Sequence, residues 1–133
     1  MSEPRTNQEV FDYVLAKLAK QGRPSVSWDG RCVFRGHNGE RCAAGWLLPD
    51  DLWSEEINRK DFCSLKSIPR FRDDERIAAL PYALVVDLQF AHDTARGDRW
   101  LEDWRRLMRD VAVKHGLQYH DPAGTPPRGE PTD

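Results

Sequence analysis

Three segments with apolar residues at every third or fourth position constrain the fold most, because this spacing puts them on one face of an α-helix. The first starts at Thr6, which is followed three residues later by glutamate as in a capping box, and ends at Gly22. The second follows Pro81, and the third ends at Gly116. We therefore expect three main helices that bury these faces together, with His92 at the rim of their core. The apolar faces comprise Val10, Phe11, Val14, Leu15 and Leu18, then Leu84, Val85 and Leu88, then Trp100, Leu101, Trp104, Leu107, Met108 and Val111.

Residues 25–35 have the pattern of a β-hairpin, with alternating apolar and polar residues around a central Asp-Gly pair. A two-residue loop would place Trp28 opposite Arg31 and Val26 opposite Val33, whereas a longer loop would exchange the two faces. The expected fold class is therefore α+β: a mainly helical single domain with a short β-hairpin in its N-terminal half.

The length of 133 residues suits one domain, which we place at residues 1–119. Residues 59–76 carry charges of both signs and contain a proline, so we expect a surface connection with one helical turn. Residues 120–133 contain four prolines and two glycines without apolar periodicity, which predicts a disordered tail.

The charge balance favours a protein partner over nucleic acid. The chain has 20 Lys and Arg residues and 22 Asp and Glu residues, which gives a formal net charge of −2 at pH 7. Binding to nucleic-acid phosphates needs concentrated positive charge. No stretch approaches the roughly 20 apolar residues that cross a membrane, and the polar start lacks the core of a secretory signal. With an odd number of cysteines, three, the sequence favours a reducing cytoplasmic location without a membrane partner. It leaves the oligomeric state open.

Two short motifs stand out, at residues 32–50 (CVFRGHNGERCAAGWLLPD) and 88–93 (LQFAHD). Together they resemble a signature of small proteins encoded by phages, prophages and bacteria. That signature runs Cys, any residue, an aromatic, Arg, a Gly turn, Cys-Ala, any residue, Gly, then Leu-Ile-Pro-Asp, and later Leu-Gln, two residues, His-Asp. The chain has Phe34 where the family commonly has Tyr, and Leu48 where Ile is common. The resemblance implies a first helix, the Cys segment, a connector, the Leu-Gln-His-Asp helix and a final helix, in that order.

The cysteines and histidines raise the possibility of a zinc site. Soft ligands could come from Cys32, Cys42, Cys63, His37 and His92. However, the sequence has no Cys-x-x-Cys pair, and small buried apolar side chains are the more usual role of free cysteines. We therefore expect no cofactor, with zinc held by Cys32, Cys42 and His92 as the alternative.

A thiol nucleophile is a second possibility, with Cys42 activated by His92 and the ring oriented by Asp93 or Asp87. Adjacent side chains on a helix diverge by about 100°, so an oriented pair of His92 and Asp93 is awkward. The alternative is structural: His92 fills the rim of the core and bonds a backbone carbonyl of the Cys segment.

The glycine-rich turn around Arg35 and Arg41 could bind an anion through its backbone N–H groups, although no Walker or dinucleotide-binding pattern is present. A forked pairing of Arg35 with Asp50 or Asp93 is favoured and would make that arginine structural. Trp53 has acidic neighbours and is either an exposed hot spot or a lid over the core. The candidate binding residues are Arg35, His37, Arg41 and Trp53.

These patterns favour a small interaction protein over an enzyme, because a compact chain without a recognisable catalytic constellation most often acts by binding. The family resemblance implies a role in modulating a host or rival system, such as a defence complex. The alternative is a small enzyme that uses Cys42 and His92, with or without zinc.

Overall fold

The structure is a computed structural model that describes residues 6–27, 29–36, 38–58, 60–95 and 97–120. These parts form seven α-helices and two single-turn 3₁₀ helices. The helices are α1 (Asn7–Gln21), α2 (Ala43–Leu47), η1 (Asp50–Leu52), η2 (Glu55–Ile57), α3 (Phe62–Leu65), α4 (Pro69–Arg72), α5 (Glu75–Ala78), α6 (Tyr82–Thr94) and α7 (Trp100–His115). The predicted tail, apart from His120, lies outside the described residues.

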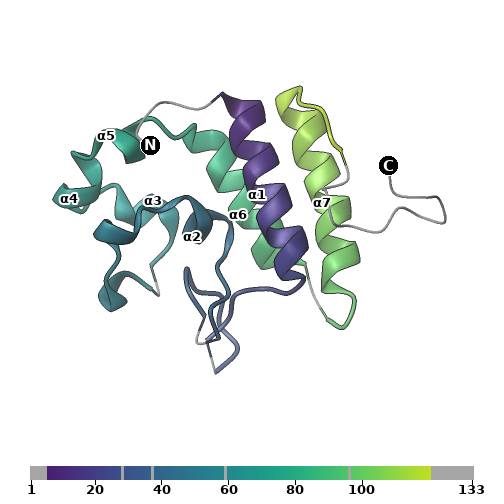
Figure 1. The fold of residues 1–133 in the computed structure, drawn as a ribbon, viewed down its shortest axis with the longest axis horizontal. Helices are drawn as coiled ribbons and strands as arrows, with labels where there is room; N and C mark the ends of the chain where they lie inside the picture. Colours follow the sequence, from purple (N-terminus) through teal and green to yellow (C-terminus); the bar gives the residue numbers. More distant parts are fainter. Residues whose placement is uncertain (1–5, 28, 37, 59, 96, 121–133) are drawn as a thin grey trace.

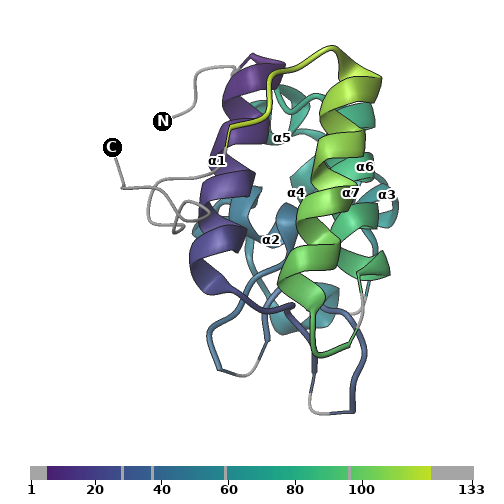
Figure 2. The same cartoon turned by 90° about the vertical axis from the view of Figure 1, so that its right-hand side faces the viewer.

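The three predicted main helices are confirmed as α1, α6 and α7, which lie side by side (Figures 1 and 2). Their apolar faces form one core around Trp104, Phe11 and Met108, whose side chains are fully buried. Both capping-box hydrogen bonds at Thr6 are present, and Gly22 ends α1 with φ of +73°. The caps seen in the sequence therefore set the bounds of α1.

A second core of buried side chains is built around the short helices α3, α4 and α5. These helices lie to one side of the main helices (Figure 1). Phe71, Ile57 and Leu65 are buried in this core, and Val85 joins it from α6. The connection between residues 59 and 76 is thus more helical than the single turn that was predicted. Asp61 and Asp74 cap the starts of α3 and α5, and a proline begins α4. None of the helices in the described parts of the chain combines the length and apolarity needed to span a bilayer.

The prediction of an α+β fold is wrong, because the described residues contain no β-strand and hence no β-hairpin. Within 25–35, the described residues form only an isolated bridge between Val26 and Cys32, closed by Ser27 N–H donating to the Arg31 carbonyl at 2.7 Å. Val26 thus pairs with Cys32 rather than with Val33, which is the register of the longer loop that the sequence left open, and Trp28 lies outside the described residues.

The isolated bridge does not extend into a ladder because a backbone N–H that the ladder needs is bonded to a side chain instead. Val33 N–H donates to the Ser25 carbonyl at 3.1 Å, and in a continuing ladder Ser25 N–H would return a bond to Val33. That N–H instead donates to His92 Nε2 at 2.9 Å, so the ladder stops at Ser25. A second turn follows with the same spacing, as an isolated bridge between Arg35 and Arg41.

Candidate functional site

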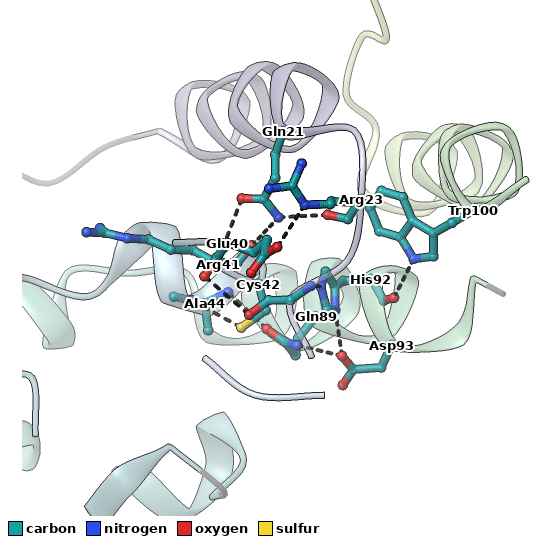
Figure 3. A network of polar contacts seen from close by, with 12 residues as sticks. Gln21, Arg23, Glu40, Arg41, Cys42, Ala44, Gln89, His92, Asp93 and Trp100 are labelled. Carbon is teal, nitrogen blue, oxygen red and sulfur yellow. Dashed lines mark hydrogen bonds and ion pairs between the residues drawn. The ribbon is translucent and has the colours of Figure 1, made fainter. Parts of the chain in front are cut away.

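His92 is the centre of a buried polar network that ties the first turn to α6 (Figure 3). Ser25 N–H donates to its Nε2 at 2.9 Å, and its Nδ1 lies 2.8 Å from Asp93 Oδ1. Because a backbone N–H can only donate, Nε2 must accept, so the proton of the neutral ring sits on Nδ1 and points at Asp93. Trp100 packs edge-on against the ring at 5.6 Å and donates its indole N–H to the His92 carbonyl at 3.2 Å.

This arrangement differs from both expectations for His92. The side chain is fully buried rather than at the rim, and it accepts from a backbone N–H instead of donating to a carbonyl. Asp93, although adjacent on the helix, does reach the His92 ring. Side-chain rotation brings the two groups together although their Cα–Cβ bonds diverge.

Gln89 joins the two halves of the signature, one turn before Asp93 on α6. Its Oε1 accepts from Ala44 N–H at 2.9 Å, at the start of α2, and its Nε2 donates to Asp93 Oδ1 at 2.8 Å. Cys42 is the N-cap of α2, with its sulfur accepting from Gly45 N–H at 3.3 Å. The Leu-Gln-His-Asp helix thus holds the start of the Cys-Ala helix by hydrogen bonds.

Cys42 is a poor nucleophile in this position. The thiol is buried, and burial raises its pKa to about 12. The thiolate is the nucleophilic form, so at neutral pH only about one molecule in 10⁵ would carry it. The chemistry around Cys42 is therefore that of a helix cap.

The group of potential metal ligands in the described residues is Cys32, His92 and Asp93, whose ligand atoms lie within 4.8 Å of one another. It differs from the predicted zinc set, with Asp93 in place of Cys42. His92 has no free lone pair in this state, because Nε2 accepts from Ser25 and Nδ1 carries the proton. A metal at this ring would have to displace the hydrogen bond that holds the first turn, which disfavours zinc here.

A cavity of about 170 Å³ lies beside this group, lined by both Cys32 and Cys42 and by Gln89 and Asp93. Cys32 is exposed, whereas Cys42 is buried. The third thiol, Cys63, is exposed on α3, and its sulfur accepts from the Tyr82 hydroxyl at 2.7 Å.

Glu40 anchors the second turn from inside. Its side chain is 8% exposed and accepts from Arg23 Nε at 2.7 Å and from Asn38 N–H at 3.3 Å. Burial alone would raise the pKa of Glu40, but the bonds from Arg23 and the backbone outweigh it and keep the pKa below its usual value. Ser25 Oγ donates to the Glu40 carbonyl at 3.4 Å, so the two turns are also joined to each other.

Three of the four predicted binding residues come together on one face. Arg35 lies over the Trp53 ring at 4.5 Å, and its Nη2 is 2.6 Å from Asp50 Oδ1. Arg41 Nη2 lies 3.6 Å from the same oxygen, and its guanidinium lies 5.1 Å from the centre of the Trp46 ring.

The array continues onto α1, where Lys17 lies 5.1 Å from the centre of Trp46 and 5.5 Å from that of Tyr13. We call this set the cation–aromatic row. It comprises Tyr13, Lys17, Trp46, Arg41, Asp50, Arg35 and Trp53.

Two amide side chains hold the arginine backbones of this row. Gln21 accepts from Arg41 N–H at 2.9 Å and donates to the Arg41 carbonyl at 3.0 Å. Asn58 does the same for Arg35, with both bonds at 2.9 Å. In the bridge between Arg35 and Arg41 these backbone groups point outward, so each amide takes the place that a neighbouring strand would occupy.

Arg35, Arg41 and Trp53 were predicted from the sequence, whereas Gln21 and Asn58, which position the two arginines, were not. Gln21 and Asn58 carry no local signal, because their partners are 20 and 23 residues away in the chain. Gln89 was visible through the motif, although its role was not. His37 lies outside the described residues, and Trp53 is half-buried under Arg35.

Comparisons of the chain with family models, with curated proteins and with solved structures find no match.

Proposed function

We propose that this chain is a small interaction protein that binds another protein through the cation–aromatic row. The observation that carries the proposal is the stacked pair of Arg35 on Trp53, which shares Asp50 with Arg41. Arginine and tryptophan are the residues that contribute most to binding energy at protein interfaces. The resemblance to phage and bacterial proteins supports a component of a host or rival defence system as the partner.

Preorganisation supports a binding role for the row. A long arginine side chain loses rotamer freedom when a partner immobilises it, at about 0.5–1.5 kcal/mol per side chain. Here the guanidinium groups already lie against aromatic rings, and Gln21 and Asn58 fix their backbones. Part of the entropic cost of binding is therefore met during folding.

The enzyme alternative has less support from the geometry. Cys42 is buried with a raised pKa, and both ring nitrogens of His92 are engaged in hydrogen bonds. The groups with catalytic potential are thus used to hold the turns against α6.

The proposal is tested by capture from a lysate of the source cell or its host, with the immobilised chain and quantitative mass spectrometry. Arg41→Ala should lower the amount of a specifically captured protein at least about tenfold, the loss typical of an interface hot spot. The matched control is Arg106→Ala, which removes an equally charged side chain from α7, where Arg106 pairs with Asp103. Circular dichroism of both variants verifies the fold. Equal capture by the two variants would refute binding through the row.

A further inference from the structure

We infer, on the basis of the proposed function, that the partner presents an acidic segment to the cation–aromatic row. In this view Asp50 occupies the position that an aspartate or glutamate side chain of the partner takes in the complex. The inference concerns the chemistry of the partner, whereas the proposed function concerns only the location of the binding face.

The charge of the row stands apart from that of the whole chain. It combines three cations, Lys17, Arg35 and Arg41, with the single carboxylate of Asp50, in a chain with a formal net charge of −2. The neighbouring carboxylate of Asp51 is already paired with Arg76, so cations outnumber free carboxylates in the row, and such an excess attracts acidic surfaces and raises association rates.

Asp50 is held loosely, in contrast to its neighbour in the sequence. Its side chain is 76% exposed, and both of its ion pairs use the same oxygen, Oδ1. Asp51 instead forms a forked pair with Arg76, with both N–O distances at 2.9 Å. A carboxylate bound through one oxygen at the surface is displaced more easily than a forked one, so a partner carboxylate can take its place.

The row fits carboxylates better than nucleic acid. Single strands bind by stacking bases on open aromatic faces. In the row, Arg35 covers Trp53, and Lys17 and Arg41 both lie over Trp46, so the rings already have cationic partners. Three cations are also few for a polyanion.

The test is a titration of the full chain with a short oligoglutamate peptide, followed by NMR. The indole N–H signal of Trp46 reports on the row, since it donates to Gln21 beside Arg41. Asp50→Asn should bind the peptide roughly fivefold more tightly than the unaltered chain, because it removes the internal competitor. Asp98→Asn gives the same change in net charge at an exposed position near α7 and should change the affinity less.

Two results would overturn the inference: equal affinities of Asp50→Asn and Asp98→Asn, or tighter binding of an oligothymidylate of matched charge. Neither result contradicts the proposed function as long as Arg41→Ala still captures less of the partner protein than its control does. Conversely, equal capture by Arg41→Ala and its control removes the proposed function even where the peptide binds.

Discussion

Replacing Gly45 with alanine tests whether α2 packs directly on the backbone of Phe34. A Cβ atom on Gly45 would lie 2.2 Å from the Phe34 carbonyl oxygen and 3.1 Å from its carbon. Both obstacles are backbone atoms, which cannot rotate away as the end of a side chain can. The start of α2 would therefore have to move away from Phe34 by roughly 1 Å to restore an ordinary contact.

The size of the effect follows from three contributions. Forcing an extra carbon into a packed contact costs about 1–3 kcal/mol. The displacement also strains the hydrogen bond from Cys42 N–H to the Phe34 carbonyl, 3.1 Å long, which is worth about 1 kcal/mol. Alanine in place of glycine inside a helix returns about 0.5–1 kcal/mol. We therefore expect the free energy of unfolding to fall by about 1–3.5 kcal/mol.

The assay is urea unfolding followed by tryptophan fluorescence, with Gly97→Ala as the control. Gly97 has φ of +77° and nothing within 4 Å of a Cβ, so only backbone strain of about 1–2 kcal/mol is expected there. A Gly45→Ala variant that is as stable as the unaltered chain would refute the close packing of α2 on Phe34.

Two further predictions concern the buried network. In native protein at pH 8, iodoacetamide should modify Cys32 and Cys63 but not Cys42, because burial raises the pKa of Cys42 to about 12; urea should expose a third site, as intact mass would show. Native modification of Cys42 would contradict its role as a buried cap. Long-range ¹H–¹⁵N spectra should show His92 as the Nδ1–H tautomer, since Ser25 N–H occupies Nε2; a proton on Nε2 would disprove that hydrogen bond.

The main helices could be predicted because their signals are local. A capping box at Thr6, a glycine at position 22 and an apolar repeat are enough to define α1, and the structure has the same bounds. Residues 59–76 offered no such repeat, since each of the short helices there spans about one turn. Burial of Phe71 and Leu65, rather than helical periodicity, holds them in place.

The hairpin prediction failed because side chains far away in sequence took over the backbone hydrogen bonds. The alternation around residues 25–35 is real, yet a ladder needs free N–H groups on both arms. His92, which lies 67 residues from Ser25, removes one of them. No pattern within the hairpin sequence contains that information, so only the tertiary fold could reveal it.

Side chains also take over backbone hydrogen bonds at the proposed binding face, where a neighbouring strand would otherwise supply them. An isolated bridge between Arg35 and Arg41 would leave outward-facing backbone groups unpaired, and Gln21 and Asn58 satisfy them without adding a strand. The two amide side chains therefore satisfy the backbone of the bridge, while Asp50 stays exposed beside the two guanidinium groups.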